Sequence, residues 1–179
     1  SNSEPGVLGT GVAAIMFTSG STGLPKAVPL THSGLLWSCE SKLKAHGGKE
    51  KVKRGTLSFL PNFHVMGFTN NFLFNVCVAR CPVFVHVDCE AVSLSFDVIM
   101  DACDSLKPSM VDTIPHMLES LASMSTSEIG ERYLTTLAQC ERVMYGGCSL
   151  SQSAIGILTS HRLQLASQYG QTETGMVLL

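Results

Sequence analysis

Short apolar runs alternate along the chain with segments in which apolar residues recur every three or four positions. Apolar runs of four to eight residues are typical of buried strands, and the three-to-four spacing is typical of helices with one buried face. Strands that alternate with helices predict an α/β fold, in which helices flank a mostly parallel sheet. The predicted strands are 12–18, 56–60, 83–87, 109–114, 142–145 and 163–167.

Five segments are candidates for helices. In the first, from residue 31, Leu35, Leu36, Cys39 and Leu43 fall on one face, and Gly47 and Gly48 end the helix. The segment 67–79 is apolar nearly all round, which predicts a buried helix or a continuation of the core. The segment 123–131 is predicted to be a mobile connection. The other predicted helices are 96–106, the segment from Pro115 through Leu121, and the segment that Ser151 caps through Leu158.

Composition narrows the class of protein. The 179 residues suggest one domain, and 45% hydrophobic with 15% charged residues suits a packed core. A net charge of −2 without a basic block argues against nucleic acid as a partner. The most apolar stretch, 68–87, is broken by polar residues and Pro82, so no membrane span is expected.

The seven cysteines form no C-x-x-C pair and have no histidines at zinc-ligand spacing. They are therefore predicted to be reduced thiols of an intracellular, cytoplasmic protein, and no signal peptide opens the chain.

The loop after the first predicted strand suits phosphate binding. Its glycines let backbone N–H groups approach phosphate oxygens, its hydroxyls donate hydrogen bonds, and its lysine adds positive charge. Because Lys26 follows Pro25 and not glycine, the loop is not a Walker A motif. Composition alone would equally allow an ordinary Ser/Gly hairpin turn. The candidate residues are Thr18, Ser19, Gly20, Ser21, Thr22, Gly23 and Lys26.

Three further segments follow predicted strands, where ligands bind in parallel sheets. The first, L-P-N-F-H-V-M-G at 60–67, contains Phe63 and His64. The second is a glycine turn of Gly146, Gly147 and Cys148, where no nearby base favours a catalytic cysteine. Taken singly, His64 would be interpreted as a structural histidine and the glycine turn as an ordinary strand-to-helix turn. The third, Q-Y-G-Q-T-E-T-G at 168–175, contributes Tyr169, Gly170, Gln171, Thr172 and Glu173.

Taken in order, the four segments resemble the signatures of the adenylate-forming superfamily, which includes acyl-CoA synthetases, luciferases and adenylation domains of nonribosomal peptide synthetases. The stretch F-T-S-G-S-T-G-L-P-K is similar to its phosphate loop, with Ala27 in place of the usual glycine after the lysine. Y-G-Q-T-E matches its Y-G-x-T-E signature. The resemblance implies part of the N-terminal core of the acyl-CoA synthetase-like fold, with ATP and Mg²⁺ as cofactors.

The resemblance also implies roles for single residues. The loop from Thr18 to Lys26 would hold the β- and γ-phosphates. Tyr169 would stack on adenine with Gly170 and Gln171 beside it, Thr172 would bind the α-phosphate, and Glu173 would help to hold Mg²⁺. The acyl group would lie among Phe63, His64, Gly146, Gly147 and Cys148. Lys26, His64, Thr172 and Glu173 would be the catalytic residues.

The implied reaction activates a carboxylic acid as its acyl-adenylate, followed by transfer to the thiol of CoA or of a carrier protein's phosphopantetheine. Amino-acid-activating relatives carry an aspartate beside the aromatic residue to balance the substrate ammonium. No aspartate lies next to Phe63, so the substrate is expected to lack an α-amino group. The L-P-x-F-H segment with P-L-T-H at 29–32 favours adenylation domains of the NRPS-like type.

The resemblance covers nearly the whole chain but not the whole superfamily fold. Residues 1–179 are expected to be a partial AMP-binding domain, without the C-terminal domain that carries the family's catalytic lysine. Two alternatives remain open: a truncated, non-catalytic nucleotide-binding remnant of such an enzyme, and a generic α/β domain with a coincidental loop. Whether this chain is an enzyme by itself is left open, although its parent is expected to be one.

Overall fold

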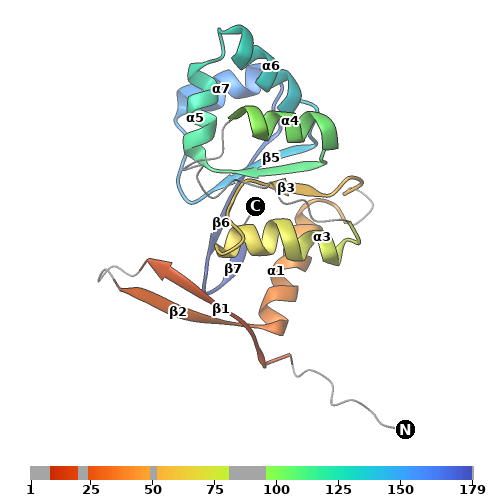
Figure 1. The fold of residues 1–179 in the computed structure, drawn as a ribbon, viewed down its shortest axis with the longest axis vertical. Coiled ribbons are helices and arrows are strands. Elements are labelled where there is room, and N and C mark those ends of the chain that lie inside the picture. Colours follow the sequence, from red (N-terminus) through yellow and green to blue (C-terminus); the bar gives the residue numbers. More distant parts are fainter. Residues whose placement is uncertain (1–8, 20–23, 49–51, 81–95, 179) are drawn as a thin grey trace.

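A five-stranded sheet forms the middle layer of the molecule in the computed structural model, which describes residues 9–19, 24–48, 52–80 and 96–178 (Figure 1). The strand order is β3-β4-β5-β6-β7, with the first four parallel and the last antiparallel. This confirms the predicted α/β class with a mostly parallel sheet. The strands are β3 (Thr56–Ser58), β4 (Met110–Thr113), β5 (Arg142–Gly146), β6 (Leu165–Gln171) and β7 (Gly175–Leu178).

Helices cover both faces of this sheet (Figure 1). One face carries α4 (Phe96–Leu106), α5 (Pro115–Ser123), α6 (Glu128–Leu137) and α7 (Gln152–Ser160). The opposite face carries α1 (His32–Ala45) and a continuous helical segment made of α2 (Val65–Gly67), the π-helical turn η2 (Phe68–Leu73) and α3 (Phe74–Cys77). Of the two alternatives for 67–79, a buried helix and a continuation of the core, the structure has the helix. Ser151 caps α7 as predicted, by accepting a hydrogen bond from Ala154 N.

Neighbouring residues of the central strands face opposite layers, because side chains alternate across a sheet. Val111 of β4 and Val143 of β5 pack in one apolar cluster with residues of α4, α5, α6 and α7. Met110 and Met144, next to them in sequence, pack in a second cluster with Phe74 of α3. All four side chains are at least 98% buried, so the sheet is covered on both faces.

The first predicted strand forms, but it is not buried. β1 (Val12–Ser19) pairs only with β2 (Pro25–Thr31), in an antiparallel hairpin that projects from the body of the molecule (Figure 1). Val12, Ile15 and Phe17 are each more than half exposed. The prediction of a buried strand was wrong because an apolar run shows that a strand is suited to burial, not that a second layer covers it.

Other predicted boundaries also need correction. Residues 128–131 form the first turn of α6, capped by Ser127, and are not part of a loose connection. Leu36, which was predicted to lie on the apolar face of α1, is 52% exposed. The buried face of this helix includes Lys42 instead. The predicted strand at 83–87 lies outside the described residues. No helix among those residues has the length and apolar character to cross a membrane.

Candidate functional site

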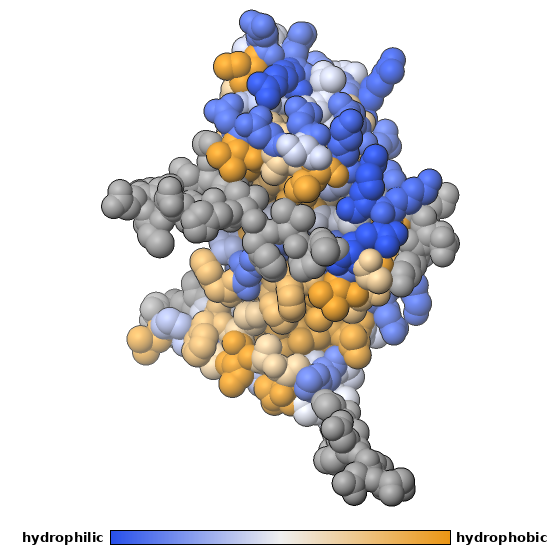
Figure 2. Space-filling view, turned by 45° about the vertical axis from the view of Figure 1, so that its right-hand side comes forward, coloured by the Kyte–Doolittle hydropathy of each residue, from blue (hydrophilic) through white to orange (hydrophobic). Residues whose placement is uncertain are grey.

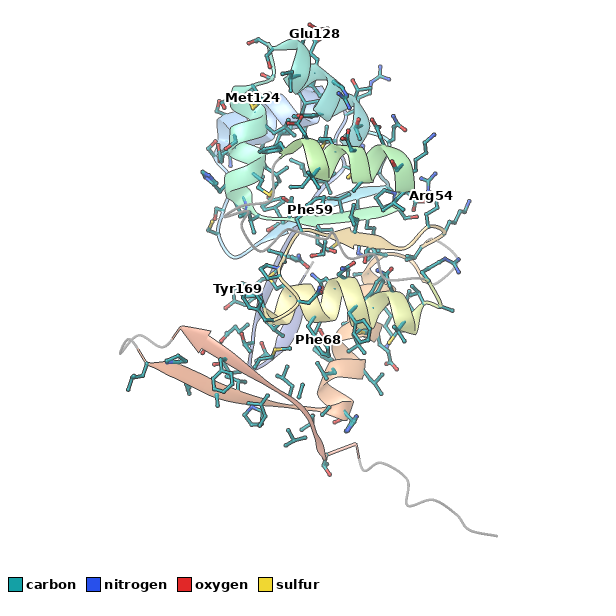
Figure 3. All side chains as sticks on the ribbon, in the orientation of Figure 1. Arg54, Phe59, Phe68, Met124, Glu128 and Tyr169 are labelled. Carbon is teal, nitrogen blue, oxygen red and sulfur yellow. The ribbon has the colours of Figure 1, made fainter. Side chains whose placement is uncertain are left out.

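A cavity of about 190 Å³ opens at the carboxyl ends of β5 and β6, where ligands commonly bind in parallel sheets. Three segments that are far apart in sequence form its walls. One is the start of the helical segment α2–η2, with His64, Val65, Met66 and Asn70. The glycine turn after β5 contributes Gly147, and the end of β6 contributes residues 168–172. Figure 3 shows Tyr169 and Phe68 on the same side of the sheet, with Met124 and Glu128 at the far end of the molecule.

His64 is held at this cavity by the turn that starts α2. Its ring Nδ1 accepts a hydrogen bond from Met66 N at 3.2 Å, so in the neutral ring the proton lies on Nε2. The turn needs Gly67, because a Cβ there would lie 2.2 Å from the carbonyl oxygen of Pro61. The L-P-x-F-H-x-x-G pattern therefore has a physical basis, since its glycine lets the helix pack on the backbone that carries the histidine.

The glycine turn after β5 is also set by a close approach. A Cβ on Gly146 would lie 2.7 Å from the carbonyl oxygen of Gln168 in the adjacent strand β6. Gly147 follows in the left-handed region at φ 94° and lines the cavity. Three predicted pocket residues are not among the lining residues: Gly146 is buried, and Cys148 and Phe63 are exposed. Of the predicted pocket residues, the structure brings only His64 and Gly147 into this lining.

The Y-G-Q-T-E segment forms the end of β6, through Gln171, and the start of the tight turn to β7. Tyr169 is 57% exposed in the cavity wall, and Gln171 Nε2 donates to its hydroxyl at 3.4 Å. Thr172 lines this cavity and also a second one of about 180 Å³, which Glu173 lines together with the start of α1. Val65, Thr172 and Gly175 line both cavities and form their shared wall, and the exposed Glu173 lines the second cavity alone.

The described part of the phosphate loop lies in the β1–β2 hairpin. Thr18 faces Lys26 across the hairpin, and its Oγ1 donates to the Lys26 carbonyl oxygen at 3.5 Å. Lys26 is exposed and lines neither cavity. Ala27 lies within β2 and is not among the residues with positive φ, so its methyl group meets no backbone strain there. Gly20, Ser21, Thr22, Gly23 and the side chain of Ser19 lie outside the described residues.

A buried ion pair behind the first cavity was not predicted. Lys42 Nζ lies 3.0 and 3.2 Å from the two carboxylate oxygens of Asp112, and both side chains are at least 98% buried. Asn70 and Gln168, which line the cavity, each donate to the same carboxylate. A signal was available in the sequence, because Lys42 falls on the buried face of a predicted helix and Asp112 in the middle of a predicted buried strand.

The donor set near Thr172 suits a hard cation bound through phosphates. Glu173 offers a carboxylate, and the hydroxyl residues Thr172 and Thr174 line the same cavity. Mg²⁺ commonly uses one or two carboxylates and takes its other ligands from phosphates and water. Among the described residues, no cluster of three or more His, Cys, Asp or Glu side chains forms a metal cage by itself.

Comparison with known proteins agrees with this geometry. The family model of AMP-binding enzymes matches residues 4–179. The 2-succinylbenzoate–CoA ligase of Staphylococcus epidermidis is 28% identical over 91% of this chain, and an adenylate-forming reductase of Aspergillus terreus is 29% identical over 90%. The chain covers 31% and 14% of these two relatives' lengths, respectively.

Solved structures show the same fold. A malonyl-CoA ligase with methylmalonyl-CoA and AMP bound superposes with a TM-score of 0.78 at 21% identity, over 97% of this chain and 35% of the ligase. The O-succinylbenzoate coenzyme A synthetase of Bacillus subtilis, in complex with AMP, gives a TM-score of 0.72 at 21% identity, over 93% of this chain and 39% of the synthetase. The chain belongs to the family of AMP-binding enzymes.

Proposed function

We propose that the complete protein of which this chain forms a part activates a carboxylic acid as its acyl-adenylate and then transfers the acyl group to a thiol of CoA or a carrier protein. One observation carries the proposal: two cavities share a wall in which Thr172 supplies a hydroxyl beside Val65 and Gly175. One cavity is lined by His64 and Tyr169, and the other by Glu173. This arrangement suits a nucleotide whose α-phosphate lies at Thr172, between the acid and the metal-bound phosphates.

In the first half-reaction, an oxygen of the substrate carboxylate attacks the α-phosphorus of ATP, and pyrophosphate leaves. Thr172 would donate its hydroxyl proton to an α-phosphate oxygen, on which negative charge develops. His64 would hold the carboxylate through Nε2–H, because Nδ1 is already the acceptor for Met66 N. Such preorganised donors typically contribute about 2.7–4 kcal/mol each. Mg²⁺ held by Glu173 would neutralise charge on the phosphate oxygens.

The remaining predicted residues would bind the nucleotide. Tyr169 has an exposed ring in the cavity wall, which suits stacking on adenine. Lys26 and the hydroxyls of the β1–β2 loop would contact the β- and γ-phosphates, which requires the hairpin and the cavity edge to approach in the loaded enzyme. In the second half-reaction, the thiolate attacks the acyl carbon, and the C–O bond to AMP breaks.

The substrate is proposed to lack an α-amino group. Among the described residues, none that lines the first cavity carries a carboxylate, and Asp112 behind them is already paired with Lys42. A substrate ammonium in this cavity would therefore have no counter-charge, which costs several kcal/mol. Aryl, keto or fatty acids meet no such penalty.

A pyrophosphate-release assay tests the proposal. The complete protein would be given Mg·ATP and matched acid pairs, such as 3-phenylpropionate with phenylalanine and 4-methylpentanoate with leucine. We expect release with acids that lack the amino group. The variant Thr172→Ala should reduce release by about a hundredfold or more, whereas the hydroxyl variant Thr135→Ala on the exposed face of α6 serves as a control and should have no effect. No release with any acid would refute the proposed reaction, and an amino acid as the best substrate would refute the substrate class.

A further inference from the structure

Four polar side chains meet directly behind the first cavity, each from a different element. They are Lys42 of α1, Asn70 of η2, Asp112 of β4 and Gln168 of β6, and each is at least 95% buried. Asn70 and Gln168 reach the cavity, whereas Asp112 and Lys42 are not among its lining residues. Asp112 and Lys42 therefore form a layer that supports the cavity floor without touching what binds in it.

The Asp112 carboxylate determines which way both amides face. It is paired with the Lys42 ammonium, and an ionised carboxylate can only accept hydrogen bonds. Asn70 Nδ2 donates to Asp112 Oδ1 at 3.1 Å, and Gln168 Nε2 donates to the same oxygen at 3.3 Å. An amide turned the other way would place its oxygen against the carboxylate, which is repulsive.

This orientation leaves an acceptor for the cavity. The nitrogen of Asn70 also donates to Gln168 Oε1 at 3.4 Å, so both of its hydrogens are used within the cluster. Among the described residues, none donates a hydrogen bond to Asn70 Oδ1, and this atom is not among the fully buried polar atoms that lack a partner. The carbonyl end of Asn70 is thus the part that remains for a bound molecule, in a cavity that the apolar residues Val65 and Met66 also line.

We infer that Asp112 is a positioning residue for substrate selection: by fixing the Asn70 amide, it makes the cavity floor an acceptor that selects acyl groups bearing a hydroxyl over the same acyl groups without one. The inference rests on the proposed function, since it assumes that the acyl group occupies this cavity. The hydroxyl-free acid would leave this buried acceptor unpaired. The hydroxy acid should therefore be preferred over it by about tenfold to a hundredfold. Without Asp112, either end of the amide can face the cavity, and the preference disappears.

The test compares acids that differ by one hydroxyl. Pyrophosphate release by the complete protein would be measured with benzoate and its three monohydroxy isomers, and with hexanoate and its 2- and 6-hydroxy derivatives. We expect at least one hydroxy acid to exceed its parent about tenfold or more in kcat/KM. In Asp112→Asn this ratio should fall toward one, while the KM for ATP stays unchanged.

Because Asp112→Asn leaves Lys42 buried without a counter-charge, it can fail to fold. The double variant Lys42→Met/Asp112→Leu removes the pair together and should show the same loss of preference. Asp104→Asn removes a carboxylate that accepts from Thr136 in the opposite layer, and it should keep the wild-type ratio.

The outcomes separate the two claims. Release with several acids but no hydroxyl preference, or a preference that survives in both Asp112 variants, would overturn this inference and leave the proposed function standing. No release with any acid would overturn the proposed function and this inference with it.

Discussion

The two faces of the central sheet are built on different principles. The face toward α4, α5, α6 and α7 buries an apolar cluster that includes Val111, Leu134 and Leu158, with no charged side chain among its members. The opposite face buries a smaller apolar cluster and, beside it, the ion pair of Lys42 and Asp112 with two amides. The candidate site lies on this second face, at the ends of β5 and β6.

The surface over the two halves differs in the opposite sense to the interior. Figure 2 shows hydrophilic side chains gathered over the upper helices and apolar ones over the lower half of the molecule. Apolar burial stabilises a fold without specifying a ligand, whereas a satisfied buried polar cluster costs desolvation and fixes the orientation of each group. On this division, the apolar face would supply stability and the polar face would supply selectivity.

The largest expected effect comes from breaking the ion pair on the polar face. Lys42→Met leaves the Asp112 carboxylate buried without its partner, which should lower the free energy of unfolding by about 3–5 kcal/mol. The double variant Lys42→Met/Asp112→Leu should recover most of this loss, because it removes both buried charges. Urea unfolding of the three proteins checks both statements. A single variant as stable as the wild type would mean that the pair is not desolvated as the structure has it.

On the apolar face, a truncation should change stability alone. Leu134 of α6 is fully buried, and Leu134→Ala should cost about 2–5 kcal/mol of unfolding free energy. Ile129→Ala, on an exposed position of the same helix, is the control and should change stability by no more than about 0.5 kcal/mol. Adenylation measured well below the unfolding midpoint should be unchanged in both variants. A loss of activity in folded Leu134→Ala would contradict the division of roles.

Substitutions of the residues proposed to bind phosphate and metal should lower activity and leave stability unchanged, the opposite of what is expected for Leu134→Ala. Lys26→Ala and Glu173→Gln each remove an exposed charge, so the fold should keep its stability. Pyrophosphate release should fall by about a hundredfold to a thousandfold, since each residue would act on phosphate charge. The loss in Glu173→Gln should exceed any loss of nucleotide affinity measured without Mg²⁺. Full activity in both variants would show that the roles carried over from the superfamily are wrong.

The smallest expected effect is a pH dependence that arises at His46. Burial, with the nearby charges of Lys42 and Arg142, lowers the pKa of His46 from 6.5 to about 4. The unfolded chain therefore binds the proton more readily between these values, so the free energy of unfolding should fall as the pH drops from about 6.5 to about 4. His46→Gln should flatten this slope in urea titrations across that range. An unchanged slope in the variant would assign the dependence to other groups.

The sequence predicted the fold class and most elements because the spacing of apolar residues differs between helices and strands and can be recognised within each segment. The amphipathic spacing of Phe96–Leu106 and the Pro115 start of α5 are local signals, and both helices form where expected. β2 and β7 were not predicted. β2 contains Pro25 and Pro29 and no continuous apolar run, and the short apolar run of β7 directly follows the polar motif at 168–175. The exposure of β1 could not be predicted, because burial depends on what packs against a strand.

The candidate site was predicted in part, for a similar reason. Short motifs identify His64, Gly147 and the Tyr169–Thr172 segment, which the fold brings to one cavity. Asn70 and Asp112 belong to no motif, and only the packing of η2 against β4 and β6 brings them together. Sequence spacing cannot show that contact, although a charged residue in a buried strand indicates that a partner must exist.

The most direct test of the account follows the oxygen of the acid. The complete protein would be incubated with Mg·ATP, a thiol acceptor and an acid whose carboxylate carries ¹⁸O in both positions. The ¹⁸O content of AMP and pyrophosphate would then be measured by mass spectrometry. If the carboxylate attacks the α-phosphorus, AMP should gain one ¹⁸O and pyrophosphate none, because thiol transfer breaks the bond between the acyl carbon and that oxygen. Unlabelled AMP, or ADP with labelled phosphate, would contradict adenylate formation at this site.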